Sequence, residues 1–255
     1  MVHIGISGHR GSGKTSVAFI LGCFLEYMKR GHNEEQLKGE FNNWCDNIKN
    51  NGTNAIYDAC WNYVYFDEFG EIPKSFVAQL LGIDMSVLDS DTLKDTMYVN
   101  MKDFKLSADV DTNKIVTPEQ YLSSVPHDKP KLIRRLKTDS YMNLRDFMKM
   151  FSVDIMQRIF GTNVWIKTRV RGNEQYGEVE DGWRIFSDVK IGDELLYIRE
   201  KEGIVIKVQR PTHKKKNNGI TNIEDASVDY NVVINSDISE MFDELYKIAK
   251  EIYER

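Results

Sequence analysis

The feature that most restricts the fold of this chain is a glycine-rich segment of eight residues close to its N-terminus. Residues 8–15 read Gly-His-Arg-Gly-Ser-Gly-Lys-Thr and match the pattern G-x-x-x-x-G-K-[ST] at every defined position. Residues 2–7 alternate apolar with small or polar side chains, which predicts a strand. Residues 16–30 carry apolar side chains at helical spacing. The segment therefore joins a strand to a helix, the context in which this motif works.

The residue types of this segment suit the binding of phosphate groups. Glycine at positions 8, 11 and 13 lets the backbone turn its N–H groups inward, toward an anion. The N-terminus of the following helix adds a partial positive charge. We expect Lys14 to neutralise the β- and γ-phosphates of a nucleoside triphosphate, and the Thr15 hydroxyl to ligate Mg²⁺. A chance match in a glycine-rich turn is the alternative.

Further strands and helices alternate along the chain. Strands are predicted at 62–66, 183–188, 203–208 and 230–234, and helices at 72–81, 143–160, 164–170, 192–202 and 237–253. The helix at 143–160 carries an apolar stripe from Leu144 to Ile159, which we expect to lie in the core. This alternation favours parallel pairing with right-handed crossovers. We therefore predict a three-layer α/β/α sandwich around a parallel five-stranded sheet, of the P-loop NTPase type.

Two stretches do not fit this alternation, and we interpret them as insertions in a single domain of residues 1–255. Residues 31–61 are polar and rich in asparagine, which predicts an excursion with one short helix. The second insertion, 84–140, holds an acidic, exposed part at 84–111 and a basic run at 128–137. A solvated face is the simpler interpretation of the basic run, and a lid that approaches phosphate groups is the alternative.

Composition restricts the class of protein further. Hydrophobic residues make up 41% and charged residues 29% of the chain, a balance that excludes wholesale disorder. The net charge of −5 disfavours a dedicated nucleic-acid-binding protein. Because no run of about 18 apolar residues occurs, no membrane span is expected. Cys23, Cys45 and Cys60 are scattered, which suits free thiols in a reducing cytoplasm.

The glycine-rich motif alone does not separate kinases from GTPases, motors and helicases. The chain has no N-K-x-D pattern for guanine recognition, and no row of four carboxylates after an apolar strand, as helicases would have. Basic residues instead occur in several separate elements around the predicted core. This distribution favours a small kinase, which must neutralise phosphates on both donor and acceptor.

Four stretches together resemble one family. They are Gly8–Ser16, Phe69–Lys74, the helix and glycine from Arg145 to Trp165, and Ser187-Asp188-Val189-Lys190 with Glu194 and Arg210-Pro211 downstream. In these stretches the chain resembles the bacteriophage deoxynucleoside monophosphate kinases, a branch of the P-loop nucleotide kinases. The resemblance spans nearly the whole chain apart from the two insertions. It implies transfer of the γ-phosphoryl group of ATP to a deoxynucleoside monophosphate, with Mg²⁺, in the cytoplasm of a host cell.

The resemblance also implies roles for single residues. ATP would be bound by Gly8, Gly11, Ser12, Gly13, Lys14, Thr15 and Ser16, with Thr15 on the metal and Arg210 stacked on the adenine. The catalytic residues would be Lys14, Asp188 and Arg145. The acceptor nucleotide would be bound by Lys74, Arg145, Trp165, Asp188, Lys190 and Glu194.

Several of these roles have structural alternatives. Asp188 would otherwise cap the following helix, the basic residues would form surface ion pairs, and Trp165 would belong to the core. Arg158 lies 13 residues after Arg145, on a different face of an unbroken helix, so we assign it to the lid side. Asp67 and Glu68 are predicted to form a solvated turn rather than to approach Mg²⁺.

The chain departs from the family pattern at three places. Lys190 replaces an arginine, Ser152-Val153 replaces Gly-Thr, and Gly219–Asn222 replaces a His-x-Ser/Thr-Glu segment. The base preference is therefore left open, as is a homodimer. Two other functions also stay open: a P-loop kinase with another small acceptor, such as dephospho-coenzyme A, and a non-catalytic nucleotide-binding regulator. No membrane or nucleic-acid partner is expected.

Overall fold

The computed structural model describes residues 1–9, 11–52, 54–59, 61–124, 140–175, 181–189, 192–211, 228–235 and 237–255. The chain divides into two compact units. Unit 1 comprises Met1–Phe69 and Arg169–Arg255, and unit 2 comprises Gly70–Thr168. Among the helices in the ranges above, none combines the length and apolar character needed to cross a membrane.

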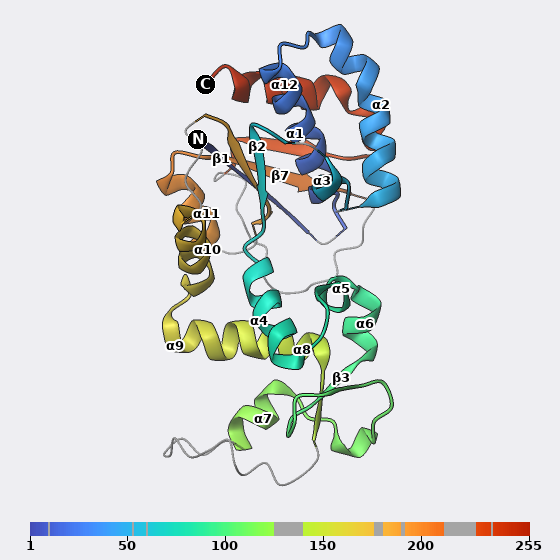
Figure 1. Cartoon of the computed structure of the whole chain (residues 1–255), viewed down its shortest axis with the longest axis vertical. Coiled ribbons are helices and arrows are strands. Elements are labelled where there is room, and N and C mark those ends of the chain that lie inside the picture. The colour runs from blue at the N-terminus through green and yellow to red at the C-terminus, as the bar shows by residue number, and fades with distance from the viewer. Residues whose placement is uncertain are drawn as a thin grey trace. The chain divides into compact units, whose positions relative to one another are not determined.

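Unit 1 is built on a parallel five-stranded sheet with the strand order β2-β6-β1-β7-β8 (Figure 1). The strands are β1 (Val2–Gly8), β2 (Val64–Asp67), β6 (Trp183–Val189), β7 (Ile204–Gln209) and β8 (Tyr230–Val233). The predicted α/β class and the predicted parallel sheet are thereby confirmed. Because β1 is the central strand, the glycine-rich segment leaves the sheet at its middle.

Helices cover both faces of this sheet. The helices of unit 1 are α1 (Lys14–Lys29), α2 (Glu34–Asn51), α3 (Asn54–Asp58), the C-terminal part of α10 (Val164–Gln175), α11 (Gly192–Glu200), the 3₁₀ turn η5 (Ile238–Glu240) and α12 (Phe242–Tyr253). On one face, Ile4 and Ile6 of β1 share a core with α1, α2 and α12. Gly5 points the other way, since side chains alternate along a strand, and there it approaches Ile198 of α11.

Helix α1 is buried from Val17 to Glu26, and two features let it approach the sheet. At Gly22 a Cβ atom would lie 2.5 Å from Cζ of Phe66, so only glycine permits this distance. Glu26 is buried, but its carboxylate accepts hydrogen bonds from Arg30 and from the backbone N–H groups of Asn62 and Tyr63. The buried charge is therefore compensated, as its burial requires.

The prediction of one short helix in residues 31–61 is wrong, because α2 alone has 18 residues. Asn33 and Gln36 form a reciprocal capping box at its start. Its buried residues are Leu37, Phe41, Trp44, Cys45 and Ile48. These five positions repeat with the spacing of a helix, but the polar residues between them lower the average hydrophobicity and conceal the pattern.

Unit 2 combines short helices with a small antiparallel sheet of order β4-β3-β5. Its elements are α4 (Glu71–Leu81), α5 (Met85–Asp89), α6 (Asp91–Thr96), β3 (Tyr98–Asn100), β4 (Leu106–Ser107), η1 (Thr112–Lys114), α7 (Pro118–Ser124), β5 (Tyr141–Asn143), α8 (Leu144–Lys149), the π-helix η3 (Met150–Gln157) and α9 (Arg158–Phe160), followed by the start of α10. The acidic stretch 84–111 is not simply an exposed insertion, since Leu88 and Val99 are fully buried in the core of this unit.

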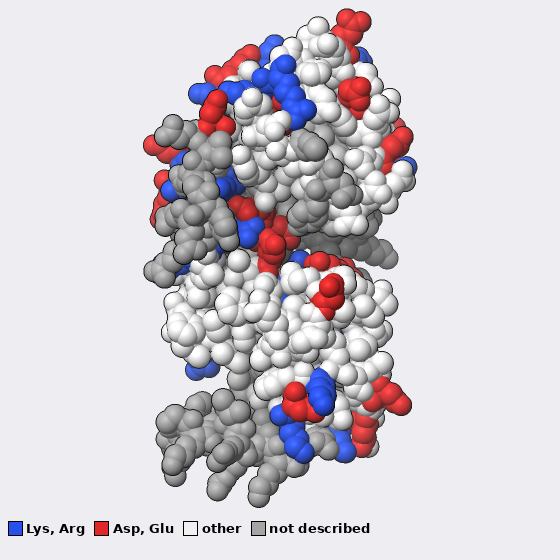
Figure 2. Space-filling model, viewed as in Figure 1, with Lys and Arg blue, Asp and Glu red and all other residues white. Residues whose placement is uncertain are grey.

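The predicted helix at 143–160 is a continuous helical run that changes from α to π at Met150 and ends at Gly161, where φ is +94°. Leu144 and Phe147 are buried as expected. The stripe is not core throughout, however, since Ile159 is 65% exposed. Figure 2 shows that much of the face of unit 2 over α4 and α8 is uncharged, and Phe76 of α4 is also exposed.

Candidate functional site

The glycine-rich segment forms a loop between β1, which ends at Gly8, and α1, which begins at Lys14. The backbone of Gly13 has φ of +94°, and a Cβ atom there would lie 2.7 Å from Cδ1 of Ile234. Both the left-handed conformation and the close approach require glycine. The strand, loop and helix are thus arranged as the motif predicts.

The side chain of Lys14 folds back over its own loop. Its Nζ atom donates hydrogen bonds to the carbonyl oxygens of Gly8 and His9, both at 2.9 Å. The ammonium group is therefore held at the start of the loop, by the carbonyl groups of Gly8 and His9. This places a full positive charge next to the partial charge of the helix end.

Ser12 contributes a buried hydroxyl group to the same loop. The residue is 3% exposed, and its Oγ atom has no hydrogen-bond partner within the described part of the chain. The hydroxyl packs against Gly8, where a Cβ atom would lie 2.7 Å from it. Buried polar groups nearly always have a partner, so this unpaired hydroxyl is an exception among the described residues.

Carboxylate residues gather where β2 and β6 end. Asp188 lies on β6, next to the central strand, and is 6% exposed. Its Oδ1 atom accepts a hydrogen bond from the backbone N–H of Phe69 at 2.9 Å. The neighbouring Ser187 donates to the carboxylate of Glu68 at 3.0 Å. These contacts join the carboxyl-terminal ends of two parallel strands, which is where ligands bind in sheets of this kind.

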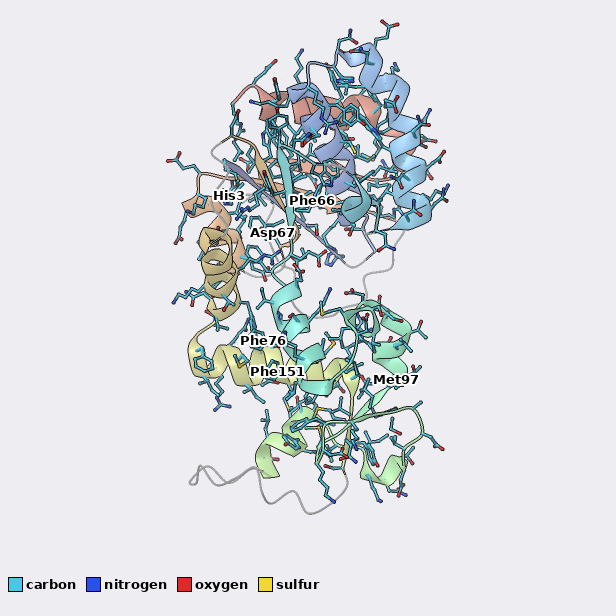
Figure 3. The ribbon with its side chains drawn as sticks, in the orientation of Figure 1. His3, Phe66, Asp67, Phe76, Met97 and Phe151 are labelled. Atoms are coloured by element: carbon cyan, nitrogen blue, oxygen red, sulfur yellow. The ribbon has the colours of Figure 1, made fainter. Side chains whose placement is uncertain are left out.

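Aromatic stacking fixes the position of Phe69. Its ring stacks on Phe186 with a centroid distance of 4.6 Å and an angle of 7° between the planes. The buried His3 of β1, labelled in Figure 3, also stacks on Phe186, with 6.0 Å between the ring centroids. Since Phe186 and Asp188 are two residues apart on one strand, the stacking places the N–H of Phe69 against Asp188.

The prediction of a solvated turn at Asp67 is wrong. This residue is 8% exposed, and its carboxylate forms ion pairs with Arg169 of α10 and with Arg184 of β6, whose Nε atom lies 3.5 Å from Oδ2 (Figure 3). The partner of Asp67 could not be identified from local pattern, because Arg169 lies 102 residues away in the chain. The only signal was that a carboxylate ending a buried strand needs a cation nearby.

Two of the predicted acceptor-site cations, Lys74 and Arg145, belong to unit 2 and form ion pairs there. Lys74 lies 2.8 Å from Asp89. Arg145 lies 2.5 Å from Asp95 and 3.3 Å from Asp91. The hydrogen bond to Asp95 is the main reason why the pKa of the Arg145 guanidinium is raised above its ordinary value. The surface ion pairs given as the structural alternative are therefore present.

Trp165 is 6% exposed and belongs to the interior of unit 2. Its Nε1 atom donates to the carbonyl oxygen of Ser152 at 2.9 Å, and its ring lies 6.0 Å from Phe76 and 6.5 Å from Phe151 (Figure 3). The ring is therefore buried, with two aromatic neighbours from the same unit. This is the core position that the sequence offered as the alternative to stacking on a base.

The remaining predicted residues are spread over the fold. Glu194 is buried in the first turn of α11, and Arg210 follows β7, with a buried Nε atom that has no hydrogen-bond partner among the described residues. Arg158 is exposed at the start of α9. Lys190, Cys60 and the whole of the basic run 128–137 lie outside the described residues, as does Gly219–Asn222.

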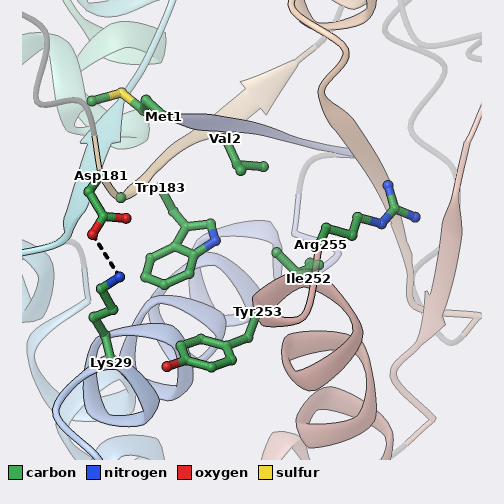
Figure 4. A pocket seen from close by; sticks show the side chains of 9 residues that line it. Met1, Val2, Lys29, Asp181, Trp183, Ile252, Tyr253 and Arg255 are labelled. Carbon is green, nitrogen blue, oxygen red and sulfur yellow. Dashed lines mark ion pairs between the residues drawn. The ribbon is translucent and has the colours of Figure 1, made fainter.

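A pocket at the opposite end of the sheet is separate from these groups. It is lined by Met1 and Val2 at the start of β1, by Trp183 at the start of β6, and by Tyr253 of α12 (Figure 4). Trp183 and Tyr253 stack at 5.7 Å. The glycine-rich loop follows the other end of β1, so this pocket is not part of the candidate site.

The fold and the loop together define the class of this chain: an α/β protein whose parallel five-stranded sheet sends a glycine-rich loop from its central strand into a helix. No protein-family model matches the chain, and no curated protein is significantly similar to it.

Proposed function

We propose that this chain is a P-loop kinase that transfers the γ-phosphoryl group of ATP to a deoxynucleoside monophosphate. One observation carries the proposal. The Lys14 ammonium group is hydrogen-bonded to the last residue of the central strand, and Asp188 lies on the strand beside it. This brings a cation for phosphate groups and a carboxylate to the same edge of the sheet. Phosphoryl transfer needs little more from a protein than such positioned charges.

On the donor side, the loop would hold the triphosphate. The backbone N–H groups at the start of α1 would face its oxygens, and Lys14 would exchange the carbonyl oxygens of Gly8 and His9 for phosphate oxygens. Ser12 would find in a phosphate oxygen the partner that it lacks among the described residues. A cation fixed in this way stabilises the charge that develops during transfer.

The protein groups fit a magnesium ion of the kind that accompanies ATP. Thr15, the second residue of α1, supplies a hydroxyl, and Asp188 supplies a carboxylate on the strand beside β1. No cluster of three or more His, Cys, Asp or Glu residues in the described ranges is arranged to hold a metal. Mg²⁺ does not need one, because it commonly binds through one or two protein groups, phosphate oxygens and water. When bound, it would offset the charge of the β- and γ-phosphates.

On the acceptor side, we assign the phosphate or sugar of the monophosphate to Lys74, Arg145 and Lys190, and its sugar or base to Glu194. Burial of Trp165 favours a structural role for that residue. The resemblance to phage enzymes would make this a protein of deoxynucleotide biosynthesis in the host cytoplasm.

The test is a coupled assay of ADP release with ATP, Mg²⁺ and each deoxynucleoside monophosphate in turn. We expect at least one monophosphate to stimulate ADP release well above the background with water, and Lys14→Ala to abolish the stimulation. If only dephospho-coenzyme A stimulates release, the chain is a kinase for another acceptor. If ATP binds but no acceptor stimulates release, the regulator is the better interpretation and the proposal fails.

A further inference from the structure

The acidic segment of unit 2 supplies the counter-ions of the cations that we assign to the acceptor phosphate. Asp89, at the end of α5, pairs with Lys74. Asp91 and Asp95, one helical turn apart on α6, both contact Arg145. A stretch that looked like an unexplained insertion in the sequence therefore lies against two of the residues most relevant to an anionic substrate.

The contacts of Arg145 use one edge of its guanidinium group. Nε donates to Oδ1 of Asp95 at 2.5 Å, and Nη2 donates to the carboxylate and the backbone carbonyl of Asp91, both at 3.3 Å. Nη1 takes part in no hydrogen bond within the described residues. The planar guanidinium group is thereby held along its Nε–Nη2 edge, and Nη1 can donate to a further hydrogen-bond acceptor.

Backbone contacts keep α6 and the start of α8 in register. The Asn143 side chain caps α8 by accepting from the N–H of Arg145, and it donates to the carbonyl of Asp95 at 3.1 Å. The N–H of Leu144 donates to the carbonyl of Met97 at 2.9 Å. The distance between the end of α6 and the start of α8 is therefore fixed independently of the ion pairs. The backbone of Arg145 is thus already in place when its guanidinium group meets the carboxylates.

We propose that Asp91 and Asp95 are positioning residues that orient Arg145 for a phosphate monoester dianion, bound at the Nη1 end. The inference rests on the proposed function. An unrestrained arginine loses rotamer freedom when it binds an anion, and fixing its fork beforehand removes part of that loss. Repulsion between the dianion and Asp91 is reduced because Lys94 pairs with this carboxylate at 3.1 Å.

The experiment measures binding of each deoxynucleoside monophosphate by calorimetry, beside the KM values for monophosphate and ATP. Asp95→Ala should raise the Kd and KM for the monophosphate roughly tenfold, as expected for loss of a charge-assisted hydrogen bond. The KM for ATP should not change. Asp95→Asn should restore binding, because its amide oxygen still accepts from Nε. The control is Asp103→Ala, an exposed aspartate of the same unit paired with Lys105.

Three outcomes would overturn the inference. Unchanged monophosphate binding in Asp95→Ala would show that the contact is only structural. Tighter binding would show that the carboxylate competes with phosphate instead of orienting Arg145. Absence of monophosphate binding to the wild-type chain would show that the monophosphate is not a ligand of this protein. Binding that depends on Asp95 without ADP release would instead refute the kinase and leave the positioning role intact. Because Asp95 is 57% exposed, the variants should fold, which their melting temperatures would confirm.

Discussion

The ammonium nitrogen of Lys14 lies 2.9 Å from the carbonyl oxygen of Gly8, so the first residue of α1 is hydrogen-bonded to the last residue of β1. A second bond of the same length reaches His9. The lysine thus spans the loop that its own motif forms, and two hydrogen bonds hold its ammonium group there. Phosphate oxygens that replace these carbonyls would meet a cation already in place, which lowers the entropic cost of binding.

Replacement of Lys14 by alanine should remove ADP release and weaken ATP binding at least tenfold, because the cation at the transferring group is lost. The hydrogen bonds of its Nζ atom to Gly8 and His9 stay within the loop, so the melting temperature should shift by no more than about 4 °C. Calorimetry with ATP and a thermal melt would measure both. Lys201→Ala, at an exposed turn, is the control. Full activity in Lys14→Ala would rule out the assignment of the loop.

Replacement of Ser12 by alanine should separate binding from stability. The Oγ atom has no partner in the described structure, so its removal should leave the free energy of unfolding unchanged or slightly increased. ATP binding should weaken by about 1.5–3 kcal/mol, the range for a hydrogen bond to a charged group. In the matched variant Ser187→Ala a hydrogen bond to Glu68 is lost, and stability should fall instead. Equal effects of both variants on stability would contradict the interpretation.

Replacement of Asp67 by alanine should destabilise unit 1 by about 3–5 kcal/mol, because the buried guanidinium of Arg184 and the partly buried guanidinium of Arg169 lose this carboxylate. Urea unfolding followed by tryptophan fluorescence would measure the change. Asp181→Ala removes an exposed ion pair with Lys29 from the same unit and should change stability little. If the two variants were equally stable, the ion pairs of Asp67 would contribute no more to the free energy of unfolding than an exposed pair does.

The stability of the chain should fall at high pH, partly because of one thiol. Burial raises the pKa of Cys45 from 9.0 to about 12. Above pH 9 the unfolded chain releases this proton while the folded chain keeps it, so stability is full below pH 9 and declines as pH rises toward 12. Cys45→Ala should flatten the dependence of the unfolding free energy on pH between 9 and 11. An identical slope in both proteins would contradict a buried, protonated thiol.

Local patterns were enough to predict the parallel sheet and the loop. Each strand is a short apolar run, and the loop carries its own glycines and lysine between β1 and α1. Helix α2 was not predicted at its full length, because charged and asparagine residues separate its five buried residues and lower the average hydrophobicity. Its capping residues Asn33 and Gln36 were the available signal.

The ion pairs could not be predicted, because they join residues distant in the chain. Asp67 meets Arg169 across 102 residues, and Asp95 meets Arg145 across 50. The tertiary fold brings such residues together: the pairing of β2 with β6 brings Asp67 near Arg184, and the pairing of β3 with β5 joins the segments that follow α6 and precede α8. A single sequence shows that a buried carboxylate needs a cation, but it does not show which one.

The contact between Asp67 and Arg169 has a consequence for how such a chain is assembled. The chain leaves unit 1 after Phe69 and returns at Arg169, so exit and return lie beside one joined pair of side chains. A domain inserted between two neighbouring points of another domain can be exchanged without a change in the fold of that domain. Exchange of unit 2 would therefore replace Lys74 and Arg145, the residues proposed here for the acceptor phosphate, and would leave the sheet and its glycine-rich loop unchanged.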